Sequence, residues 1–190
     1  MTVDDVWFFE RIAPVYDVFM PGATGATLAE GLGRAEGEVE ALLDVGGGTG
    51  RAARAIDAPR RIVLDASGRM LRRVPDGVDP VRGDARELPV RDGSVDAVLI
   101  VDAYHHLPDP EQVLEASARA LRPGGVLVIQ EFDPSTLRGW LLETGEHLFG
   151  LNSHFHPPAD LVDELGAAGL TASVVESGFA YTVAGTKPGA

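Results

Sequence analysis

Three aspartates stand at the ends of successive short segments: Asp44, Asp65 and Asp84. The first two segments are apolar runs, typical of strands buried in a parallel sheet. In an open α/β sheet ligands bind outside the carboxyl ends of the strands, so the three carboxylates should share one rim. An acid after the second strand can accept hydrogen bonds from both hydroxyls of a ribose. Asp84 can accept from an adenine amino group, while the N–H of Ala85 can donate to the ring.

Glycines at alternate positions follow the first aspartate: Gly46, Gly48 and Gly50. Glycine adopts positive φ easily and lets a ligand approach the backbone closely. The helix expected at 51–56 offers free N–H groups and the positive end of its dipole to an anionic group. The loop fits the dinucleotide pattern G-x-G-x-x-G/A, and it fits acid-x-G-x-G-x-G better. Taken alone, it leaves open both ligand classes and a tight turn without a ligand.

The five histidines are the candidate acid–base groups. His105 and His106 follow the fourth expected strand and should lie on the ligand rim. Either one is a candidate general base if the substrate must lose a proton, and packing or capping is the alternative role. The spacing of His154 and His156 could suggest a metal. Their loop is flanked by proline and shows no clear third ligand, so the sequence predicts no metal site.

Hydropathy patterns supply the elements that position these residues. Strands are expected at 41–44, 60–65, 78–82, 95–101, 126–132, 170–176 and 179–184. Helices are expected at 24–36, 51–56, 66–74, 110–121, 135–149 and 159–168, with a further helix within 4–20 that breaks near Pro14. This alternation predicts an α/β fold with a doubly wound, Rossmann-like sheet in one domain, 1–190. Seven strands in the order 3-2-1-4-5-7-6 are expected, mostly parallel, with one antiparallel strand near the edge.

The composition limits the classes of molecule that the protein is expected to bind. The net charge is −13, and Lys187 is the only lysine. An acidic surface repels nucleic acid and anionic lipid, which favours a small-molecule substrate. No apolar run reaches the ~18 residues of a membrane span, and the acidic start does not resemble a signal peptide, so a cytoplasmic location is expected. The acidity fits a salt-loving source and GC-rich codon usage equally well, and a homodimer is left open.

Six motifs occur in an order typical of one family. They are Asp44–Gly50, Asp65-Ala66-Ser67-x-x-Met70-Leu71, Gly83-Asp84-Ala85-x-x-Leu88-Pro89, Val95-Asp96-Ala97-Val98, His105-His106-Leu107-Pro108-Asp109-Pro110 and Leu121-Arg122-Pro123-Gly124-Gly125. Together they resemble the small class I S-adenosylmethionine (SAM)-dependent methyltransferases of the ubiquinone/menaquinone-biosynthesis-like (methyltransferase type 11) group. The resemblance covers residues 41–131. Residues 9–17 resemble the F-x-x-I-A-x-x-Y-D entry segment of the same group.

The resemblance implies SAM as cofactor, S-adenosylhomocysteine (SAH) as product and contacts for both ends of the cofactor. The glycines and Asp44 would hold the methionine end, and Asp65 would hold the ribose. The backbone near Asp102 would meet the methionine ammonium group. Tyr16 would lie over the cofactor within a lid formed by residues 1–20.

The resemblance also implies which residues surround the adenine. Ala66 and Met70 would border the ring, while Asp84 and Ala85 would read its edge. The chain after Phe132 matches only loosely, and residues 133–160 are expected to shape the acceptor pocket.

The leading functional hypothesis is methyl transfer from SAM to a small, hydrophobic acceptor. Such a transfer depends largely on positioning and exclusion of water. A nicotinamide-dependent oxidoreductase would account for the glycine loop and Asp65, but not for the motif at 83–85. A non-catalytic SAM-binding protein is the third alternative.

The acceptor is expected to enter between the His105–His106 turn and the loop 152–158. Apolar walls would come from Phe19, Trp140, Leu141, Phe149 and Phe155. A pocket lined in this way favours a hydrophobic ring or a lipid-like acceptor.

Overall fold

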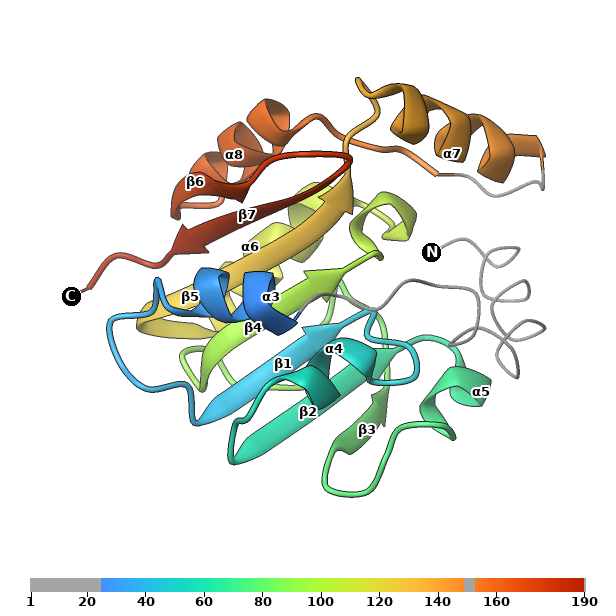
Figure 1. Cartoon of the computed structure of the whole chain (residues 1–190). Helices are drawn as coiled ribbons and strands as arrows, with labels where there is room; N and C mark the ends of the chain where they lie inside the picture. Colours follow the sequence, from blue (N-terminus) through green and yellow to red (C-terminus); the bar gives the residue numbers. More distant parts are fainter. Residues whose placement is uncertain (1–24, 149–152, 190) are drawn as a thin grey trace.

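The computed structural model describes residues 25–148 and 153–189. Seven strands form one sheet in the order β3-β2-β1-β4-β5-β7-β6, which confirms the predicted order (Figure 1). The strands are β1 (Ala41–Val45), β2 (Arg60–Asp65), β3 (Asp79–Arg82), β4 (Val95–Val101), β5 (Leu121–Phe132), β6 (Thr171–Glu176) and β7 (Ala180–Thr186). The helices are α3 (Gly25–Leu32), α4 (Arg51–Ala55), α5 (Gly68–Leu71), α6 (Pro110–Ala120), α7 (Leu137–Leu148) and α8 (Pro158–Ala167), with a 3₁₀ turn η1 (Tyr104–His106).

The direction of the strands places the predicted ligand residues on one rim. β1 pairs in parallel with β2 and β4, β2 with β3, and β4 with β5, so these five strands end at the same edge. β7 is antiparallel to both β5 and β6, as expected for one reversed strand near the edge. α7 lies beyond the carboxyl end of β5, at the same rim (Figure 1).

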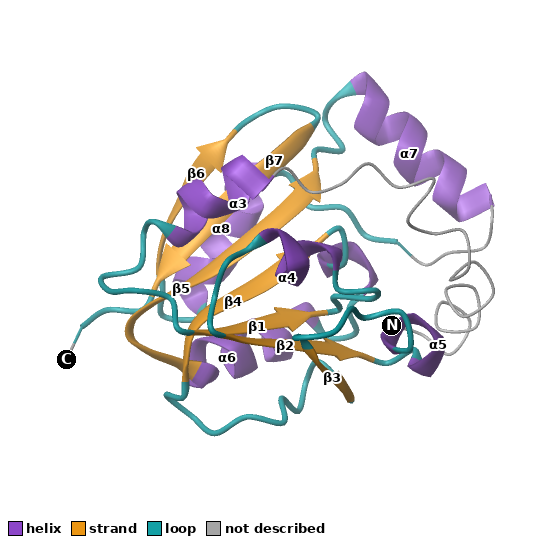
Figure 2. Ribbon diagram, turned by 60° about the horizontal axis from the view of Figure 1, so that its bottom comes forward, coloured by secondary structure: helices purple, strands orange, loops and turns teal. Residues whose placement is uncertain are grey.

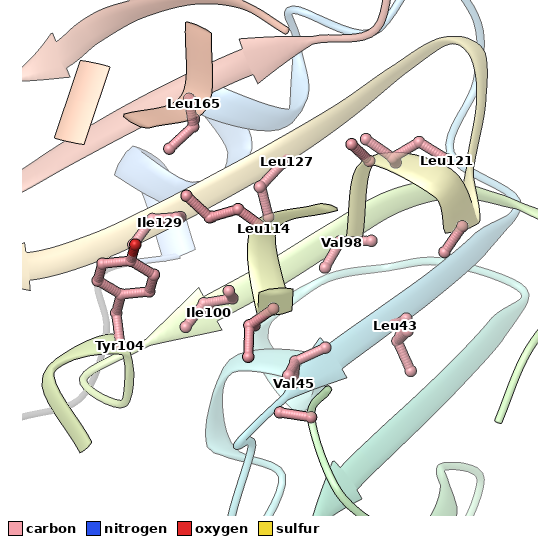
Figure 3. Close-up of a cluster of buried hydrophobic side chains, with 14 of the residues drawn as sticks. Leu43, Val45, Val98, Ile100, Tyr104, Leu114, Leu121, Leu127, Ile129 and Leu165 are labelled. Carbon is pink, nitrogen blue, oxygen red and sulfur yellow. The ribbon is translucent and has the colours of Figure 1, made fainter. Parts of the chain in front are cut away.

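Helices cover both faces of the sheet (Figure 2). Alternate residues of β1 point to opposite faces, as the period of two in a strand requires. Leu43 belongs to the buried cluster that includes residues of α6 and α8, part of which Figure 3 shows. Leu42 belongs to the cluster that includes residues of α3, α4 and α5. The core therefore lies on the two sides of the central strands and makes β1 a rigid base for the loop that follows it.

Most predicted elements agree with the structure to within two residues, but three do not. The strand expected at 126–132 begins earlier, at Leu121. The helix expected to reach residue 36 ends at Leu32. Within it, a Cβ added to Gly31 would lie 2.8 Å from Val128, so a glycine lets α3 approach β5 closely. The helix expected at 66–74 is a single turn, whose N-cap Ser67 accepts a hydrogen bond from the N–H of Met70. In the part of the chain that the structure describes, no helix has the length and apolar character needed to cross a bilayer.

Candidate functional site

The loop between β1 and α4 has the backbone conformation that its glycines predict. Gly46, Gly48 and Gly50 have φ values of +70°, +57° and +79°. Gly47 meets a different constraint, because a Cβ at this position would lie 2.5 Å from the carboxyl carbon of Asp44. The loop therefore crosses directly over the Asp44 side chain.

Asp44 is fully buried beneath this loop. Its Oδ2 accepts a hydrogen bond from the N–H of Ala53 at 3.2 Å, whereas Oδ1 has no partner among the described residues. Burial, together with the charge of Asp65, raises the pKa of Asp44 to about 7, although the Ala53 N–H and Arg51 favour its charged form. A buried carboxylate oxygen without a partner calls for an explanation, and a donor group on a ligand is one that this position supports.

Asp65 accepts hydrogen bonds from two loops of the ligand rim, the glycine loop and the loop before α5. It is 5% exposed, and its Oδ2 accepts from the N–H of Gly48 at 2.9 Å. Its Oδ1 accepts from the N–H of Ser67 at 2.7 Å. Burial raises the pKa of this carboxyl against the effect of these N–H groups. The end of β2 thereby fixes both the glycine loop and the start of α5.

A cavity of about 200 Å³ opens at the ends of β1, β2 and β3. Its lining residues are Gly46, Leu64, Asp65, Ala66, Arg82, Gly83, Asp84, Ala85, Leu107 and Pro108. Asp84 stands in its exposed part, where Arg86 makes a two-pronged contact with the carboxylate at 3.0 and 2.6 Å. The hydrogen bond from Arg86 lowers the pKa of Asp84 to about 2, so this carboxylate is charged. The cavity thus combines a floor of apolar and backbone groups with acidic acceptors.

Asp102 follows β4 on the neighbouring part of the rim. Its φ of +51° is unusual for a residue other than glycine and marks local strain of the kind found at functional sites. Its carboxylate lies 3.3 Å from Arg51 at the start of α4. Burial first, and the charge of Glu131 second, raise its pKa to about 6. Asp102 and Arg51 therefore join the β4 end to the glycine-loop helix.

The two adjacent histidines lie in a buried polar cluster on the same rim. His105 Nδ1 lies 2.9 and 2.8 Å from the two carboxylate oxygens of Glu131. Burial alone would lower the pKa of His105, but the charge and hydrogen bond of Glu131 outweigh it and raise that pKa. His106 Nδ1 lies 3.4 Å from Ser153 Oγ, and burial followed by the charge of His105 lowers its pKa to about 2. Ser153 also makes a short hydrogen bond to Glu146 on α7.

The gap expected between the histidine turn and the loop 152–158 is filled in the structure. The N–H of His154 donates to the carbonyl oxygen of His105 at 3.0 Å. The Phe155 ring stacks on the His105 ring with centroids 4.1 Å apart. The expectation that an acceptor passes between these segments is therefore wrong, because a backbone hydrogen bond and ring stacking hold them together.

Comparisons with known proteins agree with this geometry. A family model described as a methyltransferase domain matches residues 43–129. A malonyl-[acyl-carrier protein] O-methyltransferase of Dechloromonas aromatica is 36% identical over 86% of this chain and 64% of its own length. A demethylmenaquinone methyltransferase of Renibacterium salmoninarum is 38% identical over 67% of this chain and 58% of its own length. The chain thus spans about three fifths of these curated relatives.

A solved structure extends the match to the whole fold. A SAM-dependent methyltransferase of Thermotoga maritima, described as a possible histamine N-methyltransferase, superposes with a TM-score of 0.78. It is 25% identical, and the match covers 96% of this chain and 99% of that one. The chain belongs to the class I SAM-dependent methyltransferases. Neither the nicotinamide-dependent nor the non-catalytic alternative finds support in these comparisons.

The residues expected to bind SAM in this methyltransferase fall into four groups. Five of them line the cavity: Gly46, Asp65, Ala66, Asp84 and Ala85. Asp44, Gly48, Gly50 and Asp102 support the loop and helix beside it. Met70 is buried at 2% exposure and is absent from the cavity lining. Tyr16 and the expected lid, 1–20, lie outside the described residues.

The remaining candidates of the acceptor side are dispersed. His154 is exposed, whereas His156 Nδ1 lies 2.8 Å from Glu164, so these two histidines do not share a ligand position. Trp140 and Leu141 are each 55% exposed on α7 and are not enclosed in a pocket wall. Phe19 and Phe149 lie outside the described residues.

Sequence reasoning missed the partners of the histidines. Glu131 is an acid near the end of a largely apolar strand, and it is 1% exposed. A charged residue in such a strand is a signal that could have been used, because buried acids require partners. Glu146 and Ser153 give no such signal, since one lies on a helix with several polar residues and the other in a loop.

Proposed function

We propose that this methyltransferase transfers the methyl group of SAM to a small, hydrophobic acceptor. The observation that carries the proposal is Asp44 Oδ1, which has no partner among the described residues and is buried under the glycine loop, beside the cavity that Asp65 and Asp84 line. The family supplies the donor class, and the cavity offers groups that suit an adenosine.

Each part of the rim has a proposed role toward SAM. Asp44 and the glycine loop hold the methionine end, with the backbone near Asp102 against the ammonium group. Asp65 accepts from the ribose hydroxyls, and its bonds to the loop N–H groups keep the carboxylate oriented. Ala66 borders the adenine and Met70 supports that side from beneath.

Adenine recognition falls to the end of β3. The backbone N–H of Ala85 donates to the ring, and Asp84 accepts from its amino group. Arg86 keeps Asp84 ionised and holds the carboxylate at the cavity wall. A charged acceptor in a fixed direction suits an exocyclic amine better than a carbonyl.

SAM supplies an electrophilic methyl group on a sulfonium. The acceptor atom forms the new bond to carbon as the carbon–sulfur bond breaks, and SAH leaves with an uncharged sulfur. An acceptor that carries a proton releases it to His105, His106 or solvent. The chain's contribution is to align donor and acceptor and to exclude water. We place the acceptor beside His105 and His106, which follow β4, the strand next to β1. The lid of residues 1–20, with Tyr16, is proposed to complete the enclosure.

Two features favour an apolar acceptor. The relative from Renibacterium salmoninarum is named for a menaquinone, which is a hydrophobic ring compound. α7, at the same rim, presents Leu137, Trp140 and Leu141 with more than half of each side chain exposed. Apolar side chains beside a catalytic rim suit a hydrophobic ligand.

The test is binding followed by turnover. Calorimetry should show that the protein binds SAM and SAH and does not bind NAD. SAH release should then be measured across a panel of quinols, phenols, fatty acids and amines, with turnover expected among the hydrophobic members. Binding of NAD in place of SAM would overturn the donor assignment, and turnover confined to charged amines would overturn the acceptor class.

The lid is tested by a chain that starts at Gly22. This truncated protein should fold and lose turnover, because water enters the site. Full turnover in the truncated protein would show that residues 1–20 are not a lid.

A further inference from the structure

Three potential ligand atoms converge beside the cofactor cavity. His105 Nε2 lies 3.8 Å from Glu146 Oε2, and His106 Nε2 lies 4.0 Å from the same oxygen. The two imidazole rings have centroids 4.0 Å apart. The ligand atoms of the three residues all lie within 4.8 Å of one another. The two histidines come from η1 and Glu146 comes from α7, so this convergence is a tertiary feature.

The other ring nitrogens have partners that set the tautomers. The Glu131 carboxylate, at 2.8 and 2.9 Å, assigns the proton of His105 to Nδ1. The Ser153 hydroxyl donates to Glu146 and can therefore accept from Nδ1–H of His106, 3.4 Å away. In these tautomers both Nε2 atoms carry lone pairs. A ligating histidine whose second nitrogen donates to a carboxylate or another oxygen is the usual arrangement at protein metal centres.

The facing atoms are all electron-pair donors. The two imidazole Nε2 atoms and a carboxylate oxygen lie close to one another, and His105 and His106 are only 5% and 6% exposed. Two further acids, Glu131 and Asp102, stand close by. Among the described residues, Arg51 is the cation that meets Asp102, and it lies on the glycine-loop side. Buried groups of this kind are stable when a cation lies among them.

We propose that His105, His106 and Glu146 bind one divalent transition-metal ion of the zinc class. Two imidazoles and one carboxylate form a ligand set that such ions accept, with one or more positions left for water or substrate. Ligand atoms about 2.0–2.1 Å from a tetrahedral ion are about 3.3 Å apart. The two histidine–glutamate distances of 3.8 and 4.0 Å therefore require a closure of roughly 0.5–0.7 Å. The two imidazole ligand atoms, which lie within 4.8 Å of each other, would have to approach by up to about 1.5 Å.

The position of the proposed ion beside the cofactor cavity indicates a role in the reaction. Leu107 and Pro108, the next residues after His106, line the cofactor cavity. An acceptor oxygen that takes the open position would lose its proton more readily, because a metal ion lowers the pKa of a bound hydroxyl. The ion would also attach α7 to the sheet through Glu146. This site replaces the metal position that the spacing of His154 and His156 could have suggested.

A proton is the competing explanation for the same geometry. An imidazolium at His105 would balance Glu131 and Glu146 without any ion. Metal binding is measured directly, so the test does not depend on the proposed methyl transfer or on knowing the acceptor.

The experiment uses the full chain, freed of metal with a chelator. Zn²⁺ is titrated by calorimetry, and Co²⁺ is added in parallel because tetrahedral Co²⁺ has strong visible absorption. We expect one ion per chain and a Co²⁺ spectrum of the tetrahedral type. Glu146→Gln should weaken Zn²⁺ binding at least tenfold and abolish that spectrum.

Matched variants separate ligation from general charge. Glu143→Gln changes an acid on the same helix, and His154→Gln changes a histidine of the adjoining loop; both should bind Zn²⁺ as the unaltered protein does. Glu131→Gln should weaken binding ~10- to 100-fold, because Glu131 orients a ligand and is not one itself. SAH affinity serves as the folding control for each variant.

Two results would overturn the proposal. One is the absence of Zn²⁺ and Co²⁺ binding at micromolar concentrations, which would leave the proton as the balancing cation. The other is equal Zn²⁺ affinity in Glu146→Gln and Glu143→Gln, which would place any bound ion elsewhere. If Glu131→Gln fails to bind SAH, the comparison of Zn²⁺ affinity between Glu146→Gln and Glu143→Gln still tests the proposed site.

Discussion

Two parts of the ligand rim are built in different ways. The proposed adenosine side consists of residues 46–50, 65–66 and 83–85, which lie at or directly after the ends of β1, β2 and β3. Its central contact, from the N–H of Gly48 to Asp65, spans 17 positions of the chain. The proposed acceptor side consists of His105, His106, Glu131, Glu146 and Ser153. Its contacts span 26 positions from His105 to Glu131 and 47 from His106 to Ser153.

On one side the residues are positioned by the strands of the sheet, and on the other side they are positioned by contacts between side chains. On the adenosine side, parallel strands bring the loop residues together, and backbone N–H groups provide most of the bonds. On the acceptor side, α7 and the residues after it must dock before the polar cluster exists. We therefore expect substitutions on the adenosine side to change cofactor affinity and global stability together, and those on the acceptor side to act more locally.

The largest expected effect is the pH dependence that Asp44 gives to stability. Its pKa is about 7 in the folded protein, because burial disfavours the charge, against 3.8 for the ordinary group. Between these pH values the folded state holds a proton that the unfolded state has released. The free energy of unfolding should therefore fall as pH rises from about 4 to 7, by roughly 2–4 kcal/mol.

Asp44→Asn removes this titration. In urea unfolding at several pH values, the free energy of unfolding of the variant should rise relative to that of the unaltered protein as the pH increases. The variant should also bind SAM more weakly than the unaltered protein. Asp79→Asn, which alters an exposed aspartate of β3, is the control and should leave the pH profile unchanged. Parallel profiles for Asp44→Asn and the unaltered protein would show that Asp44 does not carry this dependence.

The difference between the two sides also explains which parts of the fold and of the site could be predicted from the sequence alone. Strand order and the position of Asp44, Asp65 and the alternate glycines on one rim were predictable, because these residues lie next to the strands that place them. The acceptor side was not, since nothing local pairs His106 with Ser153 or directs Glu146 toward the turn. The loop 152–158 was expected to border an opening, but whether Phe155 stacks on His105 depends on tertiary packing that no spacing encodes.

The next effect concerns the coupling of loop and cofactor through Asp65. Asp65→Ala removes acceptors for the N–H groups of Gly48 and Ser67, together with the proposed ribose contact. SAH affinity should fall by ~1–3 kcal/mol, the range for charge-assisted hydrogen bonds. Calorimetry measures this change, with Asp76→Ala on the exposed surface as the control. Unchanged SAH affinity in Asp65→Ala would remove Asp65 from the cofactor site.

The smallest effect should come from a second polar network on the acceptor side. Tyr104 Oη donates to Glu164 Oε2 at 2.6 Å, and Glu164 Oε1 lies 2.8 Å from His156 Nδ1. Tyr181 Oη donates to the carbonyl oxygen of His156 at 2.7 Å. Here each donor faces an acceptor, whereas in the first network His105 Nε2 and His106 Nε2 both face Glu146 Oε2. This network therefore needs no ion and should act only on stability.

Tyr104→Phe tests that contrast. The ring is 1% exposed and keeps its place in the apolar cluster, so only the hydroxyl bond is lost (Figure 3). The free energy of unfolding should fall by about 0.5–1.5 kcal/mol, with SAH and Zn²⁺ affinities unchanged. In a Glu164→Gln background the same substitution should cost less, because the charged acceptor is gone. A change in Zn²⁺ affinity in Tyr104→Phe would show that the two networks are coupled. It would contradict the distinction between the His156 network, which needs no ion, and the proposed ion site at His105 and His106.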